Sequence, residues 1–70
     1  MSEITAPMPG KICEVKVKIG DVIDEGQDVI VLEAMKMEMP IVATKAGTVA
    51  SISCAVEDAV QGGDVLVCIE

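Results

Sequence analysis

Lys36 stands between two methionines near the middle of the chain, with 35 residues before it and 34 after it. Its primary amine can be acylated, and the flanking Met35 and Met37 offer apolar side chains that an approaching protein can recognise besides the charge. Strand-like runs lead into this stretch at 28–32 and out of it at 39–42. Two such runs separated by a few residues predict a tight hairpin with the lysine at its tip. We therefore expect a site at which another group becomes attached to the protein.

Simpler interpretations of the same residues stand beside this one. A surface lysine is usually only a solvated charge, and methionine often fills irregular gaps in a core. Matches to motifs of four residues also occur by chance. A charged amine is almost never buried without a partner, however, which argues against burying Lys36 between the two methionines.

Other residues that could do chemistry are few. The chain has no histidine, and its three cysteines, Cys13, Cys54 and Cys68, show no Cys-x-x-Cys spacing. We expect no metal site and no catalytic constellation, so the chain is predicted to be a carrier or a binding module and not an enzyme. Each cysteine falls in a strand-like segment, which predicts buried free thiols in a reducing compartment.

Composition excludes further classes of protein. The net charge is −7, with five lysines, no arginine and no aromatic residue, so neither phosphate contacts nor base stacking has the side chains it needs. The longest aliphatic run is four residues, Val29 to Leu32, far below the length of a transmembrane segment. The first residues lack the basic and apolar parts of a signal peptide, which favours the cytoplasm.

An internal repeat organises the rest of the chain. Shifting the sequence by 37 positions superposes residues 10–33 on 47–70 without a gap, aligning Gly10 with Gly47, Gly26 with Gly63 and many aliphatic residues between them. Two copies of one unit that cannot bury its apolar face alone must pack on each other. We expect residues 1–70 to form a single domain built from both copies.

The elements of each unit are short strands punctuated by turns at glycine and aspartate, and no segment has a sustained helical period. The predicted fold is all-β, a flattened antiparallel β-barrel or sandwich of two four-stranded sheets related by a quasi-two-fold axis. Because the lysine hairpin links the two units, we expect Lys36 to project from one end, with both chain termini together at the opposite end.

Two motifs carry a resemblance to a known family. Ala34-Met35-Lys36-Met37, with Ala6-Pro7-Met8-Pro9-Gly10 upstream, closely resembles the biotin attachment domain of biotin-dependent carboxylases and decarboxylases, in the biotin/lipoyl attachment family. The resemblance implies covalent biotin on Lys36 in amide linkage. It also implies that Met35 and Met37, together with Ala34, flank the site that biotin protein ligase recognises.

The same resemblance implies the partners and the role. A biotin carboxylase would load a carboxyl group, and a carboxyltransferase or decarboxylase subunit would remove it, in settings that include acyl-CoA metabolism. The location would be the cytoplasm, or an organelle matrix for a domain of a larger targeted protein. Two alternatives stay open. Lipoyl carriers share this barrel, although they usually place Asp before the lysine, and a cofactor-free interaction module would need no modified lysine.

Overall fold

The computed structural model describes residues 2–70, and all regular structure in this range is β-strand. The eight strands are β1 (Ser2–Thr5), β2 (Gly10–Val15), β3 (Val22–Ile23), β4 (Asp28–Ala34), β5 (Met37–Val42), β6 (Gly47–Ile52), β7 (Ala59–Val60) and β8 (Val65–Ile69). The predicted all-β class is confirmed. Among the described residues there is no helix with the length and apolar character needed to cross a membrane.

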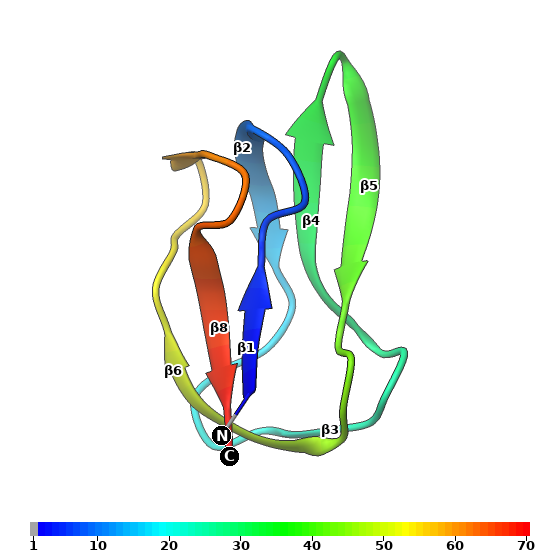
Figure 1. Cartoon of the computed structure of the whole chain (residues 1–70), viewed down its shortest axis with the longest axis vertical. Coiled ribbons are helices and arrows are strands. Elements are labelled where there is room, and N and C mark those ends of the chain that lie inside the picture. The colour runs from blue at the N-terminus through cyan, green and yellow to red at the C-terminus, as the bar shows by residue number, and fades with distance from the viewer. Residues whose placement is uncertain (1) are drawn as a thin grey trace.

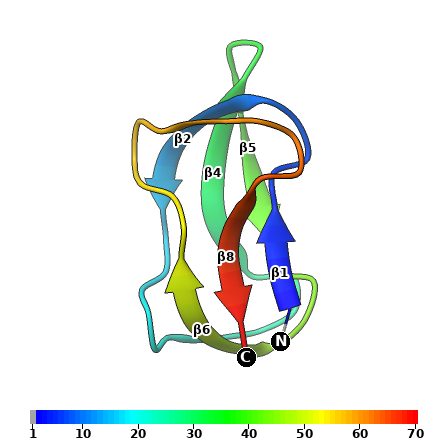
Figure 2. The ribbon, with the colours of Figure 1, turned by 60° about the vertical axis from the view of Figure 1, so that its left-hand side comes forward.

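The strands form two four-stranded sheets in which every neighbouring pair is antiparallel (Figure 1). One sheet has the order β1-β8-β6-β3 and the other the order β5-β4-β2-β7. Seen from the side, the two sheets enclose a common interior as a flattened barrel (Figure 2). This confirms the predicted sandwich of two four-stranded sheets.

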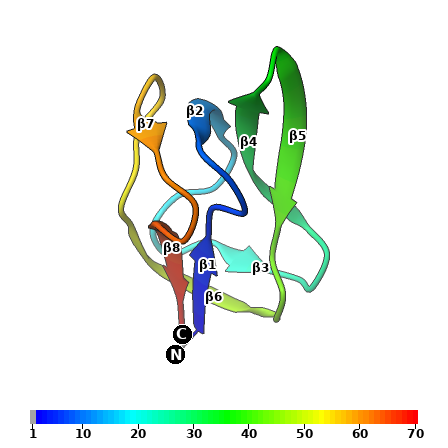
Figure 3. The same cartoon turned by 45° about the horizontal axis from the view of Figure 1, so that its top comes forward.

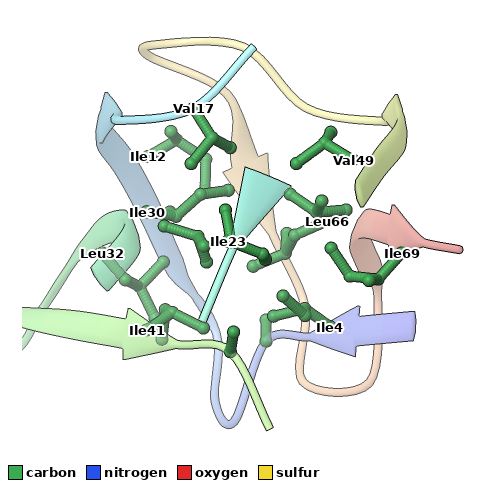
Figure 4. Packing of buried hydrophobic residues seen from close by; sticks show 14 of the residues in the cluster. Ile4, Ile12, Val17, Ile23, Ile30, Leu32, Ile41, Val49, Leu66 and Ile69 are labelled. Carbon is green, nitrogen blue, oxygen red and sulfur yellow. The ribbon is translucent and has the colours of Figure 1, made fainter. Parts of the chain in front are cut away.

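Aliphatic side chains from both sheets fill that interior (Figure 4). The largest fully buried ones are Ile12, Ile23, Ile30, Leu32 and Leu66, with Val29, Val49 and Val67. Branched side chains suit this thin space because they interlock across a layer without needing a ring-sized gap. Each of these side chains contributes on the order of 1.5–3 kcal/mol through burial, which helps so short a chain to fold.

Reciprocal hydrogen bonds relate the two units. The Gly20 N–H donates to the Val49 carbonyl at 2.9 Å, and 37 residues later the Glu57 N–H donates to the Ile12 carbonyl at 2.8 Å. Each bond joins a loop of one unit to a strand of the other. Because both units depend on such crossed bonds, neither can complete its backbone hydrogen bonding alone. This is the quasi-two-fold relation that the fold class predicted.

The equivalence extends beyond the two 24-residue segments seen in the sequence. Ser2 on β1 lies opposite Ile69, and Met39 on β5 lies opposite Leu32, which is the same pairing shifted by 37 positions. Strands β1 and β5 therefore occupy matching places at the edges of the two sheets. Each edge strand covers one side of the core.

Turns at matching positions use positive backbone dihedrals. Gly26 has φ of 85° and Gly63 has φ of 91°, a conformation that glycine adopts without steric cost. A second pair differs in residue type, since Gly20 with φ of 95° corresponds to Glu57 with φ of 80°. Glu57 therefore keeps the turn of the first unit at an energetic cost that its glycine counterpart avoids.

The prediction for the cysteines is partly wrong. Cys13 and Cys68 lie on β2 and β8, but Cys54 follows the end of β6, and all three are only partly buried. The apolar alternation at 52–56 imitates a strand, yet β6 ends at Ile52. The Ser53 N–H still donates across to the Leu66 carbonyl on β8 at 2.8 Å, and beyond it the chain leaves the sheet on its way to β7. Cys54 contacts the same carbonyl through its sulfur at 3.8 Å.

The two ends of the barrel differ. The β4–β5 hairpin projects from one end, and both termini lie together at the other (Figure 1). In the tilted view the tip of the hairpin extends beyond β2, the neighbour of β4 in the sheet (Figure 3). The long axis of the molecule measures 30 Å. This arrangement agrees with the sequence-based expectation for the lysine hairpin and the chain ends.

Candidate attachment site

The hairpin formed by β4 and β5 ends in a turn of two residues. Ala34 and Met37 lie opposite each other as the last pair of the ladder, which leaves Met35 and Lys36 as the turn. Their φ angles are 54° and 63°. Two central residues with positive φ define a type I′ turn, whose twist matches that of the flanking strands. Lys36 therefore stands at the tip, as the sequence predicted.

This turn is strained, because neither of its central residues is glycine. Type I′ turns favour Asn-Gly, and a left-handed conformation costs an ordinary L-residue about 1–2 kcal/mol. Within residues 2–70 the only other non-glycine residue with positive φ is Glu57. Strain of this kind persists where the surroundings impose it, and it concentrates at functional sites. Here the continuous β4–β5 ladder imposes it.

The side chains at the tip differ in their exposure to solvent. Met35 is 90% exposed and Met37 is 67% exposed, whereas Ala34 is buried. Lys36 is exposed as well, and its amine has no ion-pair partner among the residues described. The amine is therefore accessible to another protein, between two apolar side chains that face solvent. The two methionines are surface groups and do not fill the core.

Negative charge gathers at the base of the hairpin. Glu33 on β4 lies directly opposite Glu38 on β5, and Lys11 on β2 lies opposite Glu33 on its other side. Like charges opposite each other weaken a strand pair. The Lys11 amine bonds instead to the Glu57 carboxylate at 2.6 Å, and that hydrogen bond, with a smaller contribution from Glu33, raises the pKa of Lys11.

Partial burial, supported by the nearby carboxylates of Glu33 and Glu38, raises the pKa of the Cys13 thiol. Burial likewise raises the pKa of the Cys54 thiol, with a smaller effect from Asp58. Both thiols are therefore held in their protonated, weakly nucleophilic form at neutral pH. Lys36, by contrast, places an exposed primary amine at the tip of the hairpin.

Gly10 has a function that the sequence alone did not reveal. A Cβ atom at this position would lie 2.6 Å from the Glu33 carbonyl oxygen and 3.0 Å from the Leu32 side chain. Only glycine lets β2 approach β4 this closely where the hairpin leaves the barrel. The upstream Pro-Met-Pro-Gly motif thus ends in a residue that fixes the base of the hairpin. The signal was a glycine at a strand start, but its contact is visible only in three dimensions.

Residues 2–69 match the protein family described as "Biotin-requiring enzyme", the biotin/lipoyl family. The chain belongs to this family. The match covers the barrel with its hairpin and the upstream motif, and it confirms the resemblance inferred from the sequence. The domain is a biotin carboxyl carrier domain of the biotin-dependent carboxylase class, and biotin is its cofactor.

Similar proteins include large enzymes and small carriers. The chain is 48% identical over 69 residues to the human mitochondrial propionyl-CoA carboxylase alpha chain, covering 99% of this chain and 10% of that protein. It is 46% identical over 63 residues to the Biotin/lipoyl attachment protein of Bacillus subtilis, covering 90% of this chain and 86% of that protein.

A solved structure supports the fold assignment. The urea carboxylase of Kluyveromyces lactis superposes with a TM-score of 0.92 at 33% identity, covering 99% of this chain and 6% of that chain. The chain thus spans only a small part of the large carboxylases that it matches, but nearly all of the small bacterial attachment protein.

Proposed function

We propose that Lys36 carries biotin in amide linkage, and that the domain moves a carboxyl group between a biotin carboxylase and a carboxyltransferase or decarboxylase. The observation that carries this proposal is the exposed amine of Lys36, without an ion-pair partner in residues 2–70, in a strained two-residue turn at one end of the barrel. Family membership supplies the identity of the cofactor.

Attachment requires little of this chain beyond presenting the amine. The Lys36 nitrogen would form the C–N bond to the activated carbonyl of biotin, the activating group would leave with the electron pair of the bond that breaks, and the ligase would accept the amine proton. No residue beside Lys36 is placed to act as a base, since Glu33 and Glu38 face each other two and more positions away along the strands. Activation therefore belongs to the ligase.

Bound biotin supplies the ureido nitrogen that accepts and releases the carboxyl group. The chain supplies position. The type I′ turn fixes the Cα of Lys36, while the lysine side chain gives a flexible arm that reaches away from the barrel. A tethered group visits two nearby sites at high effective concentration without diffusing away. In this proposal the domain is a carrier and performs no catalysis of its own.

Met35 and Met37 are proposed to be the apolar contacts through which biotin protein ligase, and then the carboxylase partners, recognise the tip. Their exposure supports this role, because large apolar side chains facing solvent at a functional tip are available to a partner. Buried Ala34 would act indirectly, by fixing the end of β4 opposite Met37, directly before the turn.

The acceptor and the location are finer parts of the proposal. The match to a propionyl-CoA carboxylase chain supports an acyl-CoA as the carboxyl acceptor. Three free cysteines support a reducing compartment, either the cytoplasm or an organelle matrix.

The test is co-expression with biotin protein ligase, followed by intact-mass measurement, streptavidin binding and peptide mapping. We expect one biotinyl group per chain, on Lys36. Lys36→Arg should stay folded and lose all streptavidin binding, whereas the matched variant Lys45→Arg, also at an exposed site, should be biotinylated normally. Biotin on Lys11, Lys16, Lys18 or Lys45 in the peptide map would overturn the assignment.

A lipoyl carrier is the second candidate, favoured by one observation: the Bacillus subtilis relative is named a Biotin/lipoyl attachment protein. Co-expression with a lipoyl ligase in place of the biotin ligase tests it with the same mass spectrum. A lipoyl group on Lys36 would support this candidate. An unmodified chain after both co-expressions would support a cofactor-free interaction module instead.

A further inference from the structure

The methionines in residues 2–70 fall into two groups. Met35 is 90% exposed and Met37 is 67% exposed. Met8 and Met39 are only partly exposed and pack against the hydrophobic core. Within the described part of the chain, methionine sulfur is therefore presented to solvent mainly on the two sides of Lys36.

The register of the hairpin explains this division. Met37 and Met39 are two positions apart on β5, so they share one face of the strand. Met39 lies opposite Leu32, which is fully buried, and there the barrel covers that face. Met37 belongs to the last pair of the ladder, where the tip of the hairpin extends beyond β2 (Figure 3). The exposure of Met37 thus follows from the length of the hairpin, and that of Met35 from its place in the turn.

An exposed thioether can be oxidised by a peroxide. The sulfur lone pair attacks one peroxide oxygen, and the S–O bond forms as the O–O bond breaks. The departing hydroxide takes up the proton of the transferred OH group and leaves as water, so that sulfur is oxidised and the peroxide is reduced. The product is methionine sulfoxide, which is polar and chiral. Methionine sulfoxide reductases reverse the reaction, with a dithiol that becomes a disulfide as the oxygen leaves as water.

Oxidation at the tip would change recognition and leave the fold intact. Changes at exposed side chains usually alter stability little. Sulfoxides at Met35 and Met37 would nevertheless place polar oxygens on both sides of Lys36, where apolar contacts with partners are proposed. Covering such an oxygen with an apolar partner surface, without a hydrogen bond, opposes binding. Oxidation of Met39 would instead bring a polar oxygen against the core.

We propose that Met35 and Met37 form a reversible oxidation site that controls the access of partner proteins to Lys36. In the thioether form the tip is apolar around the amine and is recognised. In the sulfoxide form the tip is polar and is not. The oxidant is a peroxide, and the reductant is a dithiol acting through a sulfoxide reductase. Oxidation itself needs only this chain, whereas its effect on loading rests on the proposed attachment of biotin to Lys36.

The three thiols of the chain are the competing sulfur groups. Cys13, Cys54 and Cys68 are free and only partly buried. Mild oxidation converts thiols to sulfenic acids and disulfides, which a dithiol alone reverses, whereas methionine sulfoxide also requires the reductase. Treating an oxidised sample with a dithiol, first without and then with the reductase, therefore separates the effects of the two kinds of sulfur.

Peptide mapping by mass, after treatment of the chain without biotin with hydrogen peroxide at pH 7, tests the site. We expect Met35 and Met37 to gain an oxygen atom several times faster than Met8 and Met39, and the Tm to stay that of the untreated chain. After the peroxide is removed and thiols are reduced with a dithiol, biotin protein ligase should load the chain at least about tenfold more slowly, because its apolar contacts would bury the sulfoxide oxygens. Addition of sulfoxide reductases of both epimer specificities should restore the rate.

Two matched double variants identify the methionines responsible. Met35→Leu with Met37→Leu removes both sulfurs at the tip, keeps apolar side chains of similar volume, and retains the three cysteines. Whatever its starting rate, its loading should be the same before and after peroxide treatment. Met8→Leu with Met39→Leu removes the two less exposed sulfurs, and its loading should fall after peroxide treatment as it does in the parent chain.

Several outcomes would overturn the proposal: equal oxidation rates at the four methionines mapped, a loss of loading that the dithiol alone reverses, an equal loss in Met35→Leu with Met37→Leu, or normal loading of a chain that carries both sulfoxides. The untreated chain keeps the two proposals distinguishable. If the ligase does not load it, the proposed function fails, and control of loading fails with it. If the ligase loads the untreated and oxidised chains alike, only the oxidation control fails.

Discussion

Met35 offers a substitution that should stabilise the fold while impairing its function. Met35 has φ of 54° and is 90% exposed, so Met35→Gly removes a strained conformation without removing buried contacts. The left-handed conformation costs an L-residue about 1–2 kcal/mol, and the greater freedom of glycine in the unfolded chain offsets roughly 0.5–1 kcal/mol of the gain. We expect a net stabilisation of about 0.5–1 kcal/mol, which in a domain of this size raises Tm by roughly 2–8 °C.

Thermal and urea unfolding measure this gain, and biotin ligase kinetics measure its functional cost. Met35→Ala separates the two causes, because it removes the same side chain but keeps the strained backbone, so its stability should change by less than about 0.5 kcal/mol. If the side chain is what the ligase contacts, kcat/KM should fall equally in both variants. If the ligase instead depends on the fixed turn, the loss should be larger for glycine than for alanine.

Glu57→Gly is the matched control at a distance from the tip. Glu57 has φ of 80°, so replacing it by glycine should relieve the same backbone strain as Met35→Gly. The change also removes the exposed ion pair with Lys11, which lowers the net gain in stability by about 0–1 kcal/mol. Its biotinylation should be unchanged. A loss of more than about 0.5 kcal/mol in Met35→Gly would refute the reasoning, because it would mean that the methionine side chain packs on the barrel or that the turn is unstrained.

Three further predictions concern the barrel. Gly10→Ala and Gly47→Ala should each lower the free energy of unfolding in urea by about 1–3 kcal/mol. The new Cβ would lie 2.6 Å from the Glu33 carbonyl oxygen in the first variant and 2.5 Å from the Glu70 carbonyl oxygen in the second. A variant as stable as the parent would show that the strands separate easily. Gly26→Val and Gly63→Val should lower Tm by similar amounts, since the φ angles of 85° and 91° resist β-branched residues alike; a large difference between them would contradict the equivalence of the two units. Cys13 and Cys54 should react more slowly with iodoacetamide at pH 8 in the folded protein than in the urea-unfolded chain, because burial raises both pKa values and reduces the thiolate fraction. Their reaction should become faster as pH rises. Rapid labelling of these two cysteines in the folded protein at pH 8 would disprove this.

The sequence carried enough information to predict the fold class and the position of Lys36. Turn glycines and aliphatic alternation repeat at a fixed spacing of 37, and a lone lysine between two strand-like runs has few places to lie other than a hairpin tip. The repeat was detected only where residues 37 positions apart have similar side chains. It could not be followed before Gly10 and Gly47, because the residues there occupy equivalent places in the fold but have different side chains, as Glu3 and Pro40 illustrate.

The remaining features depend on three-dimensional contacts. The left-handed conformation of Glu57 follows from the turn that its unit shares with Gly20, and nothing in the identity of a glutamate announces it. The close approach of Gly10 to Glu33 joins residues far apart in the chain. Cys54 was placed in a strand because apolar alternation continues past Ile52, although the pairing of this segment with β8 stops just after Ile52, with the Ser53 N–H bond to Leu66.

The chain termini occupy the place that the lysine hairpin occupies in the other unit. Ser2 lies opposite Ile69 as Met39 lies opposite Leu32. The two ends of the chain therefore pair like the strands of a hairpin that has no connecting turn. With Met1 removed, a linker of five residues from Glu70 to Ser2, the number between Glu33 and Met39, would close that hairpin and allow the chain to be reopened elsewhere as a circular permutant. If the linker were Ala-Met-Lys-Met-Glu, the permutant would present a second lysine at the opposite pole of the 30 Å axis. The barrel is in this sense a duplicated scaffold with two equivalent positions for an arm, of which this sequence uses one.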